Sequence, residues 1–274
     1  MAGQFAHLAP VLLAKLFFVP LMIAAIALLG RRFGSRAAGL MSGFPIIGGP
    51  IVYFVYWDQG ATFALAAAQA TVAGVVGLSS FSFVYAWLAP RFSWWICLVV
   101  GWFVYATSGM ALAWAHLSVH LYALIAVVIL VAQLRWGRRS HGLLSPSATS
   151  SAEIICRMLF AAALVLAVTL SAQRLGAALT GVLAAFPIAS SVIAVFSQRL
   201  YSPWHAVLAL RALKQGLLSL LAFFYVLAVA GNYCGFNQAF TLAALVAVAI
   251  QVCVVLIGSR LRRRALSPAP ADGV

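Results

Sequence analysis

Acidic side chains are almost absent from this sequence. Its 274 residues include three Asp and Glu against 17 Lys and Arg, and only 7% of the residues are charged. A soluble domain usually has about a quarter of its residues charged. Because 65% of the residues are hydrophobic and the mean hydropathy is +1.10, a soluble fold is excluded. We expect an all-α polytopic membrane protein.

Motifs for catalysis and metal binding are missing as well. The sequence has no paired aspartates for a magnesium diphosphate, no HExxH motif and no Gly-x-Ser-x-Gly nucleophile turn. Its four cysteines show neither CxxC nor Cys/His spacing, which argues against a disulfide framework or a zinc site. We therefore expect neither an enzyme nor a protein that depends on a metal or another cofactor.

Long apolar runs account for most of the chain, and a spanning helix needs about 20 such residues. The first run is too long for a signal-peptide core and is followed by Arg31 and Arg32, so it is predicted to remain as a helix. The run 118–134 is the shortest, which keeps a count of eight open. The nine predicted spans are residues 8–29, 37–57, 61–88, 93–115, 118–134, 154–173, 177–198, 204–230 and 237–258.

Basic residues alternate between the loops that connect these runs. With nine spans, one side of the membrane receives twelve arginines between Arg31 and Arg264, whereas the other receives Arg174 and Asp58. Positive residues mark the cytoplasmic side. We predict a multi-pass protein of the bacterial inner membrane, with the N-terminus outside and a cytoplasmic C-terminus. Because the cations lie between apolar runs and not on one solvated face, nucleic-acid binding is not expected.

The chain aligns with itself at an offset of 142 residues. Arg32-Phe33-Gly34, Gly39 and Phe44-Pro45-Ile46 fall on Arg174-Leu175-Gly176, Gly181 and Phe186-Pro187-Ile188. A single extra span between the halves would insert the second half the other way up, which is an inverted-topology repeat. The predicted units are a four-helix repeat (1–117), a connector helix with a cytoplasmic loop (118–152), a second four-helix repeat (153–260) and a disordered tail (261–274).

The second helix of each half contains a helix breaker. Proline removes a helical hydrogen bond, and broken helices at matching positions of two halves often line a transporter's binding site. The alternative is an ordinary proline kink with closely packed glycines. The predicted substrate-binding residues in helices two and seven are Phe44, Pro45, Gly48, Gly49, Phe186, Pro187, Ser190 and Ser191.

Cations lie inside the apolar runs without matching acids. They are Lys15, Arg157, Arg211 and Lys214, and Gln69 occupies the position equivalent to Arg211. A charge at membrane depth is costly and usually faces the bundle interior, so an anionic ligand is a natural partner for Lys214, Arg211 and Gln69. Snorkelling of the long side chains to the interface is the competing explanation.

Two resemblances follow from these motifs. The segment from Gly39 to Pro45 resembles the corresponding part of small GlpM-type bacterial membrane proteins. The plan of two halves with broken helices is similar to inverted-repeat carriers such as the bile-acid:sodium symporter superfamily. The polar sodium-site residues of those symporters are absent here, so this resemblance implies an architecture without implying sodium coupling.

We therefore predict a secondary transporter that moves a small, anionic solute by alternating access of two inverted halves. A lipid flippase, or a non-transporting accessory of envelope lipid or polymer assembly, remains the alternative. The expected partners are membrane lipids and the small-molecule anion, and a homodimer remains open.

Overall fold

The computed structural model describes residues 21, 40, 43–136 and 151–266, and the figures label their helices α2 to α9. The described residues form helices and connecting turns, with no strand among them. The predicted span 8–29 lies outside this part except for Leu21. The helices are α2 (Gly48–Gln59), α3 (Ala61–Leu88), α4 (Trp94–Trp114), α5 (Val119–Trp136), α6 (Ser151–Ala184), α7 (Ile188–Leu200), α8 (Pro203–Ala230) and α9 (Phe236–Leu266).

Most helix boundaries coincide with the predicted ones because glycine and proline delimit the apolar runs. Gly60 has a φ of 83° and separates α2 from α3. Pro203 occupies the first turn of α8, where its missing N–H costs no helical hydrogen bond. The structure differs at the end of the chain: α9 continues to Leu266, so residues 261–266 of the expected disordered tail are helical.

The predicted break in the seventh span is confirmed. Helix α6 contains Gly176 with a φ of 73°, which divides the predicted runs 154–173 and 177–198. The segment Arg174–Ala184 and α7 then form a pair bent by 40° around Ala185–Pro187. The bend and the positive φ both lie where the sequence places glycine or proline.

Four described helices are long and apolar enough to cross a membrane, or five if the bent pair is one span. Inside the bundle, 67% of the apolar stretches of α3 and of α8 is buried, compared with 22% for α4 and 11% for α9. Helices α3 and α8 therefore form the inner pair, and α4 and α9 present apolar side chains outward. The prediction of nine spans extends beyond the part of the chain that the structure describes.

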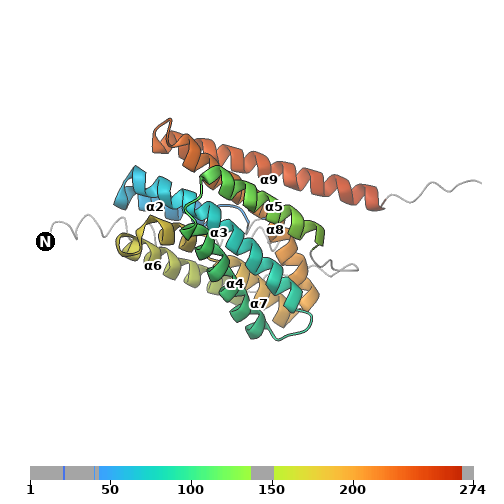
Figure 1. Cartoon of the computed structure of the whole chain (residues 1–274). Helices are drawn as coiled ribbons and strands as arrows, with labels where there is room; N and C mark the ends of the chain where they lie inside the picture. Colours follow the sequence, from blue (N-terminus) through green and yellow to red (C-terminus); the bar gives the residue numbers. More distant parts are fainter. Residues whose placement is uncertain (1–20, 22–39, 41–42, 137–150, 267–274) are drawn as a thin grey trace, which may run out of the picture.

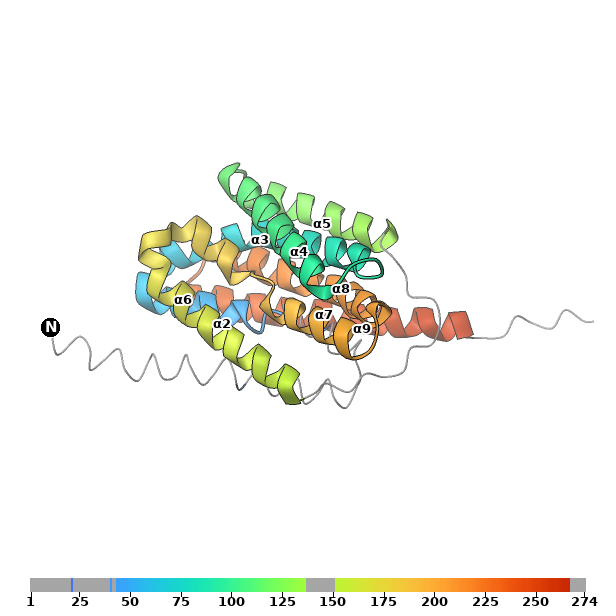
Figure 2. The same ribbon diagram turned by 90° about the horizontal axis from the view of Figure 1, so that it is seen from below.

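The inner pair consists of helices that match at the offset of 142 residues and run in opposite directions. Helices α3 and α8 have the same length, 28 residues, with both boundaries in register. A Cβ placed on Gly231, after the end of α8, would touch Leu65 near the start of α3. At the other end, the Gln198 amide donates to the Ala89 carbonyl at 3.1 Å. Figures 1 and 2 show the same antiparallel course for α4 and α9.

Apart from Arg211 and Lys214 inside α8, several charged side chains lie at the two ends of the bundle. Arg199 stacks on Trp94, with 5.4 Å between its guanidinium carbon and the ring centroid, and exposed Arg91 lies in the same loop region, which we term the basic end. Asp58 lies in the last turn of α2 at the opposite end, where Tyr56 stacks on Phe236 with 4.0 Å between ring centroids. This separation follows the charge pattern of the sequence.

Candidate functional site

Both helix breaks have the same backbone geometry. The Ile46 N–H donates to the Phe44 carbonyl at 2.7 Å, which closes a tight turn around Pro45. The Ile188 N–H donates to the Phe186 carbonyl at 2.8 Å in the same way. Helices α2 and α7 begin directly after these turns. The two Phe-Pro sequences therefore produce one local structure twice.

The carbonyls that precede the breaks are capped by side chains from the other half of the chain. The Gln251 amide of α9 donates to the Leu40 carbonyl at 3.3 Å, and the Tyr105 hydroxyl of α4 donates to the Val182 carbonyl. Leu40 and Val182 are equivalent positions at the offset of 142. Each of these carbonyls also accepts a backbone N–H, from Gly43 at 3.2 Å or from Ala185 at 3.0 Å. The side chains therefore add a second hydrogen bond, which ties the two halves together at each break.

Each inner helix packs against the break that belongs to the other half of the chain. A Cβ on Gly74 of α3 would lie 2.9 Å from the Ala185 Cβ and 3.4 Å from Val182. A Cβ on Gly216 of α8 would come closer than 3.0 Å to the Leu40 carbonyl oxygen. Each inner helix thus uses a glycine to approach the break that belongs to the other half.

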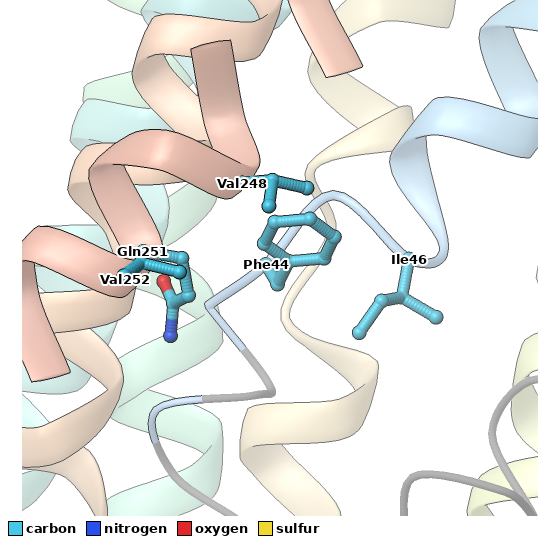
Figure 3. Close-up of a pocket in the computed structure, with 5 residues that line it drawn as sticks. All are labelled: Phe44, Ile46, Val248, Gln251 and Val252. Atoms are coloured by element: carbon cyan, nitrogen blue, oxygen red, sulfur yellow. The ribbon is translucent and has the colours of Figure 1, made fainter. Parts of the chain in front are cut away.

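The first break borders a small apolar cavity and two aromatic rings. A cavity of about 190 Å³ is lined by Phe44, Ile46 and three residues of α9, among which Gln251 supplies the polar group (Figure 3). Gly48 and Gly49 face Phe224 and Phe223, and a Cβ on either glycine would lie 3.0 or 3.5 Å from these rings. The surroundings of Phe44, Pro45, Gly48 and Gly49 therefore suit an apolar group better than a charge.

The second break has partners within the protein. The Ser190 hydroxyl donates to the Pro187 carbonyl at 3.1 Å, and the Trp102 indole N–H donates to the Ser191 hydroxyl at 2.9 Å. Phe186 packs against the rings of Trp102 and Tyr105. The predicted residues at both breaks lie in one region, because a Cβ on Gly48 would lie 3.5 Å from the Ala184 carbonyl oxygen.

Lys214 lies in the interface between α8 and α3, between Leu213 and Gly216, which approach Gly43 of the first break. Its ammonium stands over the Phe83 ring, 5.2 Å from the ring centroid, and the residue is 2% exposed. Within the described chain, this ammonium has no hydrogen-bond acceptor and no ion-pair partner. A desolvated cation–π contact contributes on the order of 2 kcal/mol, whereas a buried unpaired charge costs several kcal/mol.

Arg211 precedes Lys214 by one turn and reaches the connector helix. Its guanidinium donates to the Leu134 carbonyl of α5 at 2.8 Å. The neighbouring residue Gln133 accepts a hydrogen bond from the Ser79 hydroxyl of α3 at 2.6 Å. Ser79 lies one turn before Phe83, which contacts Lys214. These contacts link α3, α5 and α8, and we name the four polar residues that take part in them the α5 basic cluster: Ser79, Gln133, Arg211 and Lys214.

The remaining predicted cations are not part of the cluster. Gln69, equivalent to Arg211, donates to the Leu117 carbonyl at 3.2 Å near the opposite end of α5. Lys15 and the side chain of Arg157 lie outside the described residues. The structure therefore places the predicted site residues in two groups, the paired breaks and the α5 basic cluster, with Gln69 apart.

Sequence reasoning missed several polar groups at these places. Ser79, Gln133 and Gln251 are isolated polar residues in apolar runs, and that isolation is the signal that could have found them. Tyr105 offers no such signal, because aromatic residues are frequent throughout this chain.

Comparisons with known proteins gave no match among protein-family models, curated proteins or solved structures.

Proposed function

We propose that the protein is a secondary transporter for a small anionic solute, built from two inverted halves that alternate around the paired breaks. The observation that carries this proposal is the exchanged packing of the inner helices. Gly74 meets the break of the second half, and Gly216 meets the break of the first, at positions related by the repeat offset.

Alternating access follows from this symmetry. Two equivalent halves that run in opposite directions can exchange conformations, which gives outward-facing and inward-facing states of similar energy. The breaks would act as the hinges of this motion, because helices α2 and α7 each begin at a proline turn and are not continuous with the preceding segment. The separation of charges to two ends supports nine spans with a cytoplasmic basic end.

An anionic substrate follows from the charge inventory. Lys214 and Arg211 lie within the apolar length of α8, and the described chain offers Lys214 no acid. Asp58 belongs to the opposite end of the bundle. A solute that supplies negative charge would therefore be stabilised inside this protein, whereas a cation would be repelled.

Reconstituted vesicles test the proposal directly. Uptake of radiolabelled phosphate, sulfate, acetate and succinate is measured under an imposed membrane potential, with empty vesicles as the reference. Protein-dependent uptake of at least one anion is expected. Pro187→Ala, which alters the break, is expected to reduce that uptake at least about tenfold, whereas Pro203→Ala at the start of α8 is the matched control.

The same vesicles also show the results that would contradict the carrier proposal. If no anion enters and fluorescent phospholipids cross between the leaflets, the protein is a flippase and the carrier proposal is wrong. If uptake is equal for the Pro187→Ala and Pro203→Ala variants, transport stands but the breaks are not its hinges.

A further inference from the structure

The connector helix α5 packs against both members of the inner pair, α3 and α8. Near its start, the Leu117 carbonyl receives Gln69 of α3, and His120 shares a 3.0 Å hydrogen bond with Tyr225 of α8. Near its end, the Leu134 carbonyl receives Arg211 of α8. Gln69 and Arg211, which are equivalent at the repeat offset, therefore donate hydrogen bonds at the two ends of α5.

The two ends of α5 differ in charge. Gln69 and Arg211 are equivalent positions, and Val72 is the counterpart of Lys214. Tyr225 and Phe83 are likewise equivalent, and each is paired with a basic side chain, His120 or Lys214. The fold thus repeats a contact pattern, but only the end toward the basic end of the bundle has both an arginine and a lysine.

Lys214 points toward the basic end of the bundle. A helical side chain leans toward the N-terminus of its own helix, and α8 begins at the basic end. Phe83 lies near the end of α3, on the same side. Even so, Lys214 is 2% exposed, so its ammonium has not reached water by snorkelling. Burial with an aromatic ring as partner distinguishes Lys214 from an interfacial lysine.

The α5 basic cluster is composed of groups that donate hydrogen bonds. Arg211 and Lys214 carry positive charge and repel each other. Gln133 accepts from Ser79 through its oxygen, which leaves its amide nitrogen directed elsewhere. Two cations, an amide N–H₂ and an interior location match the requirements of an oxoanion, whose oxygens accept several charge-assisted hydrogen bonds.

We propose that the α5 basic cluster binds an oxoanion, a carboxylate or phosphate group, between α3, α5 and α8, with Lys214 as its principal counter-ion. This deepens the proposed function, on which it rests, by giving the substrate's charged group a place. The anion reaches it from the basic end, because the equivalent contacts at the other end of α5 offer Gln69 and Val72.

Thermal unfolding of the purified full chain in detergent tests the site. Sodium phosphate, sodium acetate and a short-chain phosphatidic acid are added at constant ionic strength, with sodium chloride as the reference. For the wild type, we expect the melting midpoint to rise by at least about 3 °C with phosphate or acetate. Lys214→Met should abolish this rise, whereas Arg91→Gln, which removes an exposed cation at the same end, should retain it.

The reference condition separates a ligand site from a structural contact. Without an oxoanion, Lys214→Met should melt at or above the wild-type temperature, because it removes a buried unpaired charge. A lower midpoint for Lys214→Met in chloride, with an unchanged response to phosphate and acetate, would overturn the proposal. So would the absence of any shift in the wild type.

The remaining outcomes identify the source of the anion and separate the two proposals. A Lys214-dependent shift with phosphatidic acid alone supports the site and assigns it to a lipid phosphate. If binding depends on Lys214 but vesicles show no uptake, the site stands and the carrier proposal fails. Uptake that is unchanged in Lys214→Met, together with oxoanion shifts that are unchanged in that variant, leaves the carrier standing and refutes the site.

Discussion

The exchanged glycine contacts make a quantitative prediction about Gly216. An alanine Cβ there would come closer than 3.0 Å to the Leu40 carbonyl oxygen, so α8 and the first break must move apart. Overpacking of this kind costs about 1–3 kcal/mol. Replacing glycine with alanine inside a helix stabilises the helix by about 1 kcal/mol. Gly216→Ala should therefore destabilise the protein by up to about 2 kcal/mol.

Gly109 provides the matched control, because it is also inside an apolar helix and faces the other break. A Cβ there would lie 3.4 Å from a Val182 methyl group, an ordinary contact that a side chain can accommodate. Gly109→Ala should be neutral or stabilising by up to about 1 kcal/mol. The two variants should differ by about 4–8 °C in melting midpoint, followed by tryptophan fluorescence at one heating rate.

Equal midpoints for the Gly216→Ala and Gly109→Ala variants would refute the close approach of α8 to the first break. Gly74→Ala refines the test, since its Cβ would meet the Cβ of Ala185 at 2.9 Å and not a backbone oxygen. An intermediate midpoint is expected for Gly74→Ala. A midpoint below that of Gly216→Ala would contradict the geometric ranking.

Four further outcomes are expected. Tyr105→Phe should lower stability by about 0.5–1.5 kcal/mol by removing the cap on a break carbonyl. Tyr85→Phe should be neutral or stabilising, because the buried Tyr85 hydroxyl has no partner in the described chain; thermal unfolding of both variants checks the contrast. Gly176→Ala should cost about 1–2 kcal/mol, since its φ of 73° strains a residue with a Cβ, and the same assay measures it. In a cysteine-free background, an impermeant maleimide applied to intact cells should label Tyr233→Cys but not Arg91→Cys; the reverse pattern would invert the proposed topology.

The sequence predicts helix boundaries best where glycine or proline flanks an apolar run. The run 61–88 was predicted to the residue, because Gly60 precedes it and Pro90 with Arg91 follows it. The breaks were equally readable, since proline cannot continue a helical hydrogen-bond ladder. Lys214 and Arg211 were found because charge inside an apolar run is conspicuous.

The faces through which the helices meet could not be predicted. Helix α3 is apolar on all sides, so no periodic pattern indicates which residues face α5, α6 or α8. The contact of Lys214 with Phe83 joins distant runs, and the sequence gives no reason to prefer this ring among 18 phenylalanines. For the same reason, the sequence did not indicate that the Lys214 ammonium faces α3.

The exchange of caps between the halves has a consequence for synthesis of the chain. The Leu40 carbonyl is capped by Gln251, 211 residues later. A ribosome completes the first break long before the helix that caps it exists. Until then the Leu40 carbonyl has the Gly43 N–H as its donor, because lipid offers it no other. We therefore expect the contact that ties the first break to the second half to form only when α9 enters the membrane.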